Sequence, residues 1–164
     1  MTQTMPLPGY STSQFSTARQ PRGKLRIVLA YENIVAARQG RRVCDRVIRE
    51  LGMERAHVSF TAWRLDVLQI PELILSAVHQ AQRADVVVVA LQSQDSLPPA
   101  ALGWLDQWTK HRTHGPGVLV AILNPIAGEA THFSEAADQL RLAAVEARMD
   151  FFCTSDFQVE AARA

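Results

Sequence analysis

This chain of 164 residues has few cysteines and lacks the common nucleotide-binding motifs. The two cysteines, Cys44 and Cys153, are far apart and lie within apolar segments, so a reduced cytoplasmic protein is the simplest interpretation. Neither G-x-G-x-x-G nor G-x-x-x-x-G-K-[ST] occurs. Dinucleotide-binding and P-loop chemistry therefore lack their usual sequence signature.

An excess of one charge and long apolar runs are also missing. Seventeen basic and sixteen acidic residues give a net charge of +1, which offers no overall field for nucleic acid or an acidic membrane. No run approaches the roughly 18 apolar residues of a membrane span. The N-terminus lacks the apolar core of a secretion signal. Apolar residues make up 48% of the chain, which is ordinary for one globular domain.

The most informative segment is the apolar run from Val86 to Leu91, which follows Asp85 and contains four valines. No polar residue alternates with the apolar ones, and this pattern is typical of a central parallel strand that helices cover on both faces. Residues 118–123 repeat the pattern. The chain is therefore predicted to contain at least two doubly buried strands.

Strands and helices are predicted to alternate along the whole domain. The predicted strands are 25–30, 57–63, 85–91, 118–123 and 150–154, and the predicted helices are 33–51, 71–83, 98–112 and 134–148, with a loop at 64–70. This order predicts an α/β fold, a doubly wound five-stranded parallel sheet with the strand order 2-1-3-4-5. Residues 1–23 are expected to be a disordered or docking tail, 24–156 the flavodoxin-like domain, and 157–164 a short tail or helix.

A final helix that would cover strands three to five is too short in this sequence. The first helix is expected on one face and the other three on the opposite face, so part of the first face needs another cover. Three covers remain open: a short C-terminal helix with Val159 and Ala162, the N-terminal tail with Tyr10 and Phe15, or another subunit. We predict a homodimer or a contact with a protein partner on this face, and the alternative is that the chain covers the face itself.

Ligands of such sheets bind where the parallel strands end. Polar residues follow the predicted strands at this edge, and the candidate ligand residues are Glu32, Asp66, Ser93, Gln94 and Asn124. A Ser93–His132 pair oriented by Asp66 or Asp95 is a further geometric possibility for nucleophilic chemistry. The competing interpretation is an ordinary rim of solvated loops. No metal site is expected, because His57, His79, His111 and His114 are predicted to lie away from this edge.

The topology resembles that of receiver domains, but the catalytic residues of that family are missing. The strand ends carry Tyr31–Glu32, Leu91–Gln92 and Thr154–Ser155 where a receiver has an acidic pair, a phosphoacceptor Asp and a Lys. Flavodoxins, which share the topology, bind a phosphate with a Ser/Thr/Gly-rich turn after the first strand. Here Tyr31 to Val35 contains no glycine and one carboxylate, so FMN is disfavoured and no cofactor is expected.

Several segments are similar to those of uncharacterised small bacterial proteins with a degenerate receiver-like or flavodoxin-like fold. These segments are Ala30-Tyr31-Glu32, Trp63 to Leu68, the helix with Trp104 and Trp108, and Met149-Asp150-Phe151-Phe152. The resemblance spans most of residues 24–156. It implies the fold and no particular activity.

Two helix surfaces are candidates for interactions. Trp104 and Trp108 lie one turn apart, and they form either part of the core or a contact for a partner. The first helix carries the basic stripe Arg38, Arg42, Arg46 and Arg49, which is either a solvated face or a site for a phosphate-rich partner.

Taken together, the sequence favours a non-catalytic module for protein interaction, regulation or assembly. The alternative is a small enzyme or ligand-binding protein that uses the polar strand ends. A second alternative is a phosphate-rich partner, such as nucleic acid, on the basic stripe, although the balanced net charge makes nucleic acid the less expected partner. No contact with a membrane is expected.

Overall fold

A computed structural model describes residues 24–92, 96–123 and 134–153. The strands are β1 (Leu25–Tyr31), β2 (Val58–Arg64), β3 (Val86–Leu91), β4 (Val118–Leu123) and β5 (Asp150–Cys153). The helices are α2 (Ile34–Glu50), α3 (Pro71–Gln82), α4 (Pro99–Lys110) and α5 (Ser134–Ala147), with short 3₁₀ turns η1 (Arg55–His57) and η2 (Leu65–Gln69). None of the helices in these ranges is long and apolar enough to cross a bilayer.

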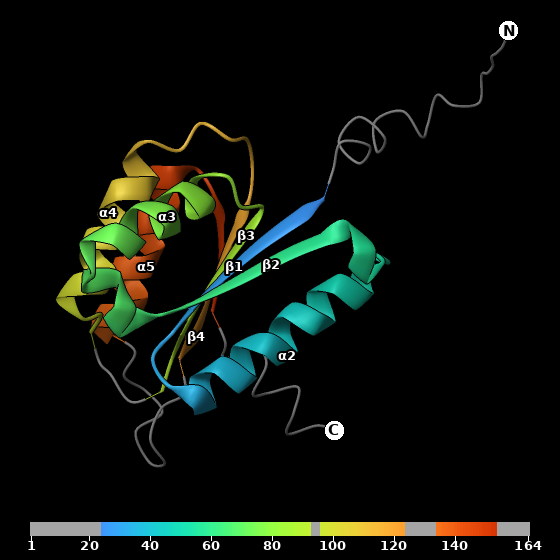
Figure 1. Cartoon of the computed structure of the whole chain (residues 1–164), viewed down its shortest axis with the longest axis horizontal. Coiled ribbons are helices and arrows are strands. Elements are labelled where there is room, and N and C mark those ends of the chain that lie inside the picture. Colours follow the sequence, from blue (N-terminus) through green and yellow to red (C-terminus); the bar gives the residue numbers. More distant parts are fainter. Residues whose placement is uncertain (1–23, 93–95, 124–133, 154–164) are drawn as a thin grey trace, which may run out of the picture.

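The five strands form one parallel sheet in the order β2-β1-β3-β4-β5. This is the predicted order, and the predicted flavodoxin-like α/β fold is confirmed (Figure 1). β3 lies in the middle, hydrogen-bonded to β1 on one side and β4 on the other. All six of its residues are buried, as the unbroken apolar run predicts.

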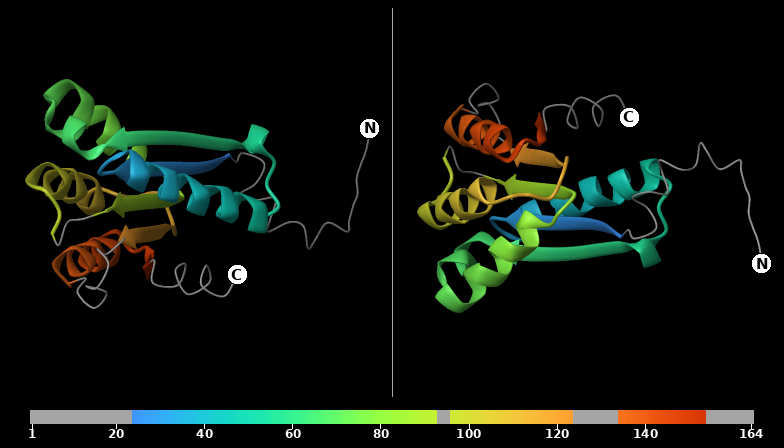
Figure 2. Two further views of the ribbon diagram at one scale, coloured as in Figure 1. Left: turned by 90° about the horizontal axis from the view of Figure 1, so that it is seen from below. Right: turned by 90° about the horizontal axis from the view of Figure 1, so that it is seen from above.

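The helices divide unequally between the two faces of the sheet. α2 packs on one face, while α3, α4 and α5 cover the other (Figure 1). Figure 2 shows α3, α4 and α5 side by side in the order of the strands that they cover. Alternate residues of β3 enter the two cores: Val87 and Val89 face α3–α5, and Val86 and Val88 face α2. The predicted distribution of the four helices is confirmed.

Helix α2 begins and ends at residues whose chemistry favours helix termini. The Asn33 side chain accepts the backbone N–H of Ala36 as an N-cap, which satisfies one of the free donors of the first turn. Gly52, with φ of 68°, follows the last turn and allows the left-handed conformation there. The buried residues of α2 are Ala36, Gly40, Val43, Cys44 and Ile48, whereas Leu51, the C-cap residue, is exposed.

The segment predicted as a loop over 64–70 contains the 3₁₀ turn η2. Leu65 and Leu68 are both buried under the α3–α5 layer. A 3₁₀ helix has three residues per turn, so side chains three positions apart lie on the same side. The loop prediction missed this turn because a segment of five residues is too short to show a helical period in its sequence.

The apolar residues on the α2 face of β4 are out of water in the single chain. Val120 and Ile122 are 5% and 3% exposed, although α2 packs mainly on β1 and β3. Exposed apolar surface on this side is found at the edge strand, where Phe152 is 52% exposed. The tail segments 1–23 and 157–164, to which the sequence assigned a possible covering role, lie outside the described residues.

Two glycines in helices, one buried and one exposed, allow a test of how tightly α2 packs on the sheet. A Cβ at Gly40 would lie 2.5 Å from Cδ1 of the buried Leu29, whereas a Cβ at the exposed Gly103 in α4 meets nothing within 4 Å. We expect Gly40→Ala to lower the free energy of unfolding by about 1–3 kcal/mol, because overpacking outweighs the gain in helix propensity. Gly103→Ala should raise it by about 0.5–1 kcal/mol.

Urea denaturation of both variants measures the two effects. A Gly40→Ala chain as stable as the unsubstituted protein would contradict the close approach of α2 to β1.

Candidate functional site

The neighbouring strands β1 and β3 are followed by connections that leave the sheet towards opposite faces. The segment after β1 leads to α2 on one face, and the segment after β3 leads to α4 on the other. Such a switch point is where open parallel sheets bind their ligands. Glu32 and Asn33 follow β1 here, and Gln92 follows β3.

These three half-buried residues are joined by hydrogen bonds. The Glu32 carboxylate oxygen Oε1 accepts the backbone N–H of Gln92 at 2.7 Å, and the backbone N–H of Glu32 donates to the carbonyl of Ala90 at 3.0 Å. The Asn33 amide Nδ2 donates to Oε1 of Gln92 at 2.7 Å. We call Glu32, Asn33 and Gln92 the switch-point cluster. Its side chains connect the start of α2 to the end of β3.

The start of α2 does not fit the phosphate of a flavin. A phosphate at a helix N-terminus needs free backbone N–H groups and positive or neutral surroundings. Here the Asn33 side chain already accepts the N–H of Ala36, and the carboxylate of Glu32 adds a negative charge beside the cap. The exposed side chains of the first turn are Ile34 and Val35, which provide no polar group for a ligand.

Of the other predicted rim residues, Asp66 is the one that lies within the described ranges. Asp66 forms an exposed ion pair with Arg64, Nε to Oδ1 at 3.3 Å, and such a surface pair contributes little to stability. Ser93, Gln94 and Asn124, together with Asp95 and His132 of the conceivable nucleophilic site, lie outside the described residues.

Neither a metal centre nor an activated thiol emerges from the described residues. Across 24–92, 96–123 and 134–153, no group of three or more His, Cys, Asp or Glu side chains could hold a metal ion. Burial raises the pKa of the Cys44 thiol to about 12, so this sulfur is protonated at neutral pH and is a poor nucleophile. Cys153 is half-buried in β5.

The two tryptophans belong to the core and not to a partner surface. Trp104 and Trp108 are both 0% exposed, and their ring centroids are 5.7 Å apart with an interplanar angle of 58°. Of the two interpretations that the sequence left open, the core interpretation is confirmed. α4 lies between α3 and α5, so more of its circumference is buried than in a helix at the edge of a layer.

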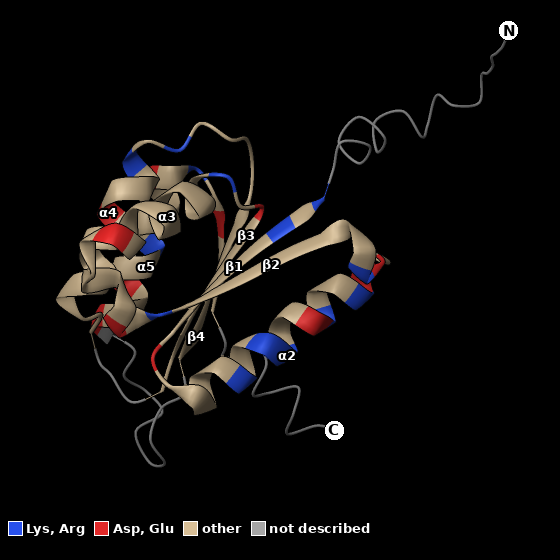
Figure 3. Cartoon of the chain, viewed as in Figure 1, with Lys and Arg blue, Asp and Glu red and all other residues tan. Residues whose placement is uncertain are grey.

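The basic stripe of α2 is only partly neutralised (Figure 3). Arg46 pairs with Glu50 at 3.3 Å, and Arg41, on a neighbouring side of the helix, pairs with Asp45 and lies over the ring of Phe60. The remaining exposed side chains are those of Arg38, Arg42 and Arg49, which form no ion pair with another residue of the described ranges. At 100° per residue these three lie within about 40° of one another on the helix surface.

Sequence reasoning missed a pocket at the opposite, amino-terminal edge of the sheet, between β1, β2 and α3. Its signal was present in the alternation of β2. Val58 and Phe60 face α2, which places the small polar residues Ser59 and Thr61 on the side of α3.

No protein-family model matches the sequence, and no curated protein matches it. Among solved structures, the chain is similar to the azoreductase from Bacillus anthracis str. Sterne, with a TM-score of 0.50 and 10% sequence identity. The alignment covers 84% of this chain and 91% of the azoreductase chain. At this identity the likeness shows a shared flavodoxin-like fold.

The hydrogen bond of Glu32 gives a stability test of the switch-point cluster. Glu32→Ala leaves the half-buried N–H of Gln92 without this acceptor and should lower the free energy of unfolding by about 1–3 kcal/mol. Glu32→Gln keeps an acceptor oxygen at the same place, so it should lower the free energy of unfolding by less. Chemical denaturation measures both, with Asp66→Ala as the control for an exposed carboxylate.

A carboxylate that is held in place for catalysis often destabilises the fold, so its removal would raise stability. A higher free energy of unfolding in the Glu32→Ala variant would therefore contradict the structural role of Glu32.

Proposed function

We propose that this protein is a non-catalytic flavodoxin-like module that acts in regulation or assembly by binding another protein chain. The observation that carries the proposal is the switch-point cluster. At the place where this fold offers its ligand site, the polar side chains of Glu32, Asn33 and Gln92 bond to one another and cap α2. Their hydrogen-bonding groups serve the connection between β3 and α2, which supports a structural use of this edge.

The alternative is an enzyme or ligand-binding protein that uses Glu32, Asp66, Ser93, Gln94 and Asn124. The similarity to an azoreductase favours this alternative at the level of the fold, because that protein is an enzyme. The exposed Arg64–Asp66 pair and the Gln92 N–H on Glu32 favour the binding module.

The surface that best suits a protein partner is the outer edge of the sheet on the side of α2. β5 pairs with β4 along one side only among the described strands, and an edge strand offers backbone groups for pairing with another chain. Phe152 adds an exposed aromatic side chain on the α2 face of this strand, and aromatic residues are enriched at the centres of interfaces. We infer that a second copy of the chain is the partner, with Phe152 at the contact.

Light scattering after size-exclusion chromatography tests this surface. The unsubstituted chain should be a dimer, and Phe152→Thr should be a monomer, since threonine keeps the β-strand preference and removes the aromatic contact. Leu142→Gln is the matched control, because Leu142 is an exposed apolar residue on α5, in the layer on the opposite face. A chain that stays monomeric up to its solubility limit would contradict self-association.

A phosphate-rich partner on α2 is the second candidate. Arg38, Arg42 and Arg49 favour it, because they form no ion pair within the described ranges. Each phosphate contact makes the slope of log binding constant against log salt concentration more negative by about 0.9, so three contacts give a slope of about −3. Replacing all three arginines with Gln should abolish binding of single- or double-stranded oligonucleotides in fluorescence anisotropy. Arg141→Gln on α5 is the control, and a flat salt response would remove this candidate.

A further inference from the structure

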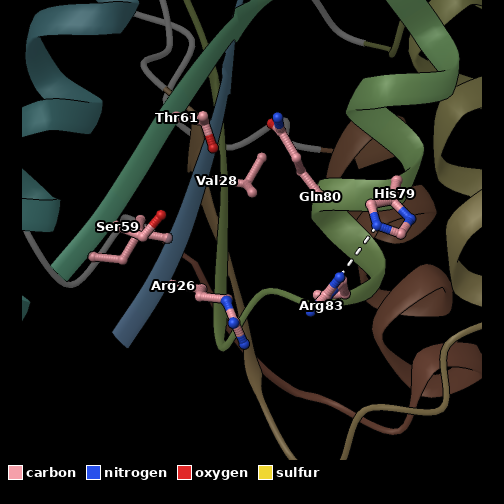
Figure 4. A pocket seen from close by; sticks show the side chains of 8 residues that line it. Arg26, Val28, Ser59, Thr61, His79, Gln80 and Arg83 are labelled. Carbon is pink, nitrogen blue, oxygen red and sulfur yellow. Dashed lines mark hydrogen bonds between the residues drawn. The ribbon is translucent and has the colours of Figure 1, made fainter. Parts of the chain in front are cut away.

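A polar pocket of about 300 Å³ opens between the sheet and the C-terminal half of α3. Figure 4 shows its lining side chains, with Arg26 and Val28 from β1, Ser59 and Thr61 from β2, and His79, Gln80 and Arg83 from α3 and the residue after it. The pocket lies near the amino-terminal ends of β1 and β2, at the edge opposite to the switch-point cluster.

The pocket exists because small side chains of the edge strand face α3. Ser59 and Thr61 leave room that larger apolar residues would fill, while Trp63, two residues further along β2, packs against the core. The indole N–H of Trp63 donates to Oε1 of Gln80 at 2.8 Å, which fixes Gln80 and with it the spacing between β2 and α3. The walls are thus held at a defined separation.

The charge of the lining is positive. Arg26, His79 and Arg83 are basic, and no Asp or Glu lines the pocket. The guanidinium of Arg26 makes no hydrogen bond or ion pair to any residue within the described ranges. The Nη1 atom of Arg83 donates to Nε2 of His79 at 3.3 Å, so the imidazole is the acceptor and the guanidinium carries the positive charge of this pair.

The carboxylate that comes nearest in sequence, Asp85, is engaged elsewhere. Its Oδ2 accepts the backbone N–H of Arg26 at 2.8 Å, and its Oδ1 lies 3.0 Å from Nε2 of His114. These contacts hold the start of β1 against the turn before β3, and Asp85 is not among the residues that line the pocket. The positive charge of the pocket is therefore left for a ligand.

The C-terminal end of a helix normally disfavours anions, because its free carbonyl groups carry partial negative charge. Here the Nη1 atom of Arg112 donates to the carbonyls of Ala81, Gln82 and Ala84 at 3.3, 3.3 and 2.9 Å. The guanidinium of Arg112 thus lies against the carbonyl groups at the end of α3. The usual repulsion of an anion at this place is offset.

We propose that this pocket binds a small phosphorylated molecule, with its phosphate between the guanidinium groups of Arg26 and Arg83. A phosphate monoester carries close to two negative charges and three acceptor oxygens, which suits two arginines from different walls better than a carboxylate does. Ser59, Thr61 and Gln80 then face the polar remainder of the molecule. A volume of about 300 Å³ lies at the small end of ligand pockets and fits one phosphorylated head group.

Isothermal titration of the full chain with inorganic phosphate, pyrophosphate and a small sugar phosphate tests the proposal, with malonate as the carboxylate comparison. We expect saturable binding of the phosphate compounds with one site, and at least about tenfold weaker binding after Arg26→Gln or Arg83→Gln. Thr61→Leu should block binding without removing any charge, because it fills the pocket. Arg55→Gln, an exposed arginine paired with Asp45, should bind as the unsubstituted chain does.

Thermal unfolding without ligand shows that the variants are folded. No saturable binding of any phosphate compound, equal binding of malonate, or equal weakening in Arg55→Gln would each overturn the proposal. None of these outcomes depends on the dimer surface at Phe152, so failure here is distinguishable from failure of the proposed function.

Discussion

The burial of β3 on both faces is the constraint on which the rest of this structure depends. Val86 to Leu91 are all buried, so their backbone groups must be paired within the sheet and their side chains must be covered by helices on two sides. β1 and β4 supply the backbone pairing. α2 covers one face and α3, α4 and α5 cover the other, and the position of each helix follows from this need.

The two edges of the sheet use their polar residues in different ways. At the carboxyl edge, the switch-point cluster joins the end of β3 to the start of α2 through short hydrogen bonds. At the amino edge, Asp85 and Arg112 bind main-chain groups of β1 and α3, while the arginines around the pocket remain without a carboxylate partner in its lining. The described polar side chains at the carboxyl edge therefore bond mainly to one another, whereas the lining of the pocket at the opposite edge keeps basic groups that a ligand can reach.

Much of the fold could be predicted from particular residues. The valine run of β3 and the repeat in β4 indicated doubly buried strands, and the alternation of strands and helices indicated the observed strand order. η2 was missed because a turn of five residues is too short for periodicity to distinguish it from a loop. The two tryptophans were left open between core and surface, since a helix with apolar residues around most of its circumference looks the same in sequence whether it is buried between two helices or exposed to a partner.

The sequence by itself determined the fold class, the strand order and the absence of the phosphate-binding motifs, because these depend on local periodicity and on residue types at strand ends. Only the tertiary structure decided that Glu32, Asn33 and Gln92 bind one another, and that Arg26, Ser59 and Arg83 surround one pocket. The partners in these contacts come from segments far apart in the chain; Glu32 and Gln92 are 60 residues apart. Their distances are set by how the helices pack on β3, and a pattern of neighbouring residues carries no record of that packing.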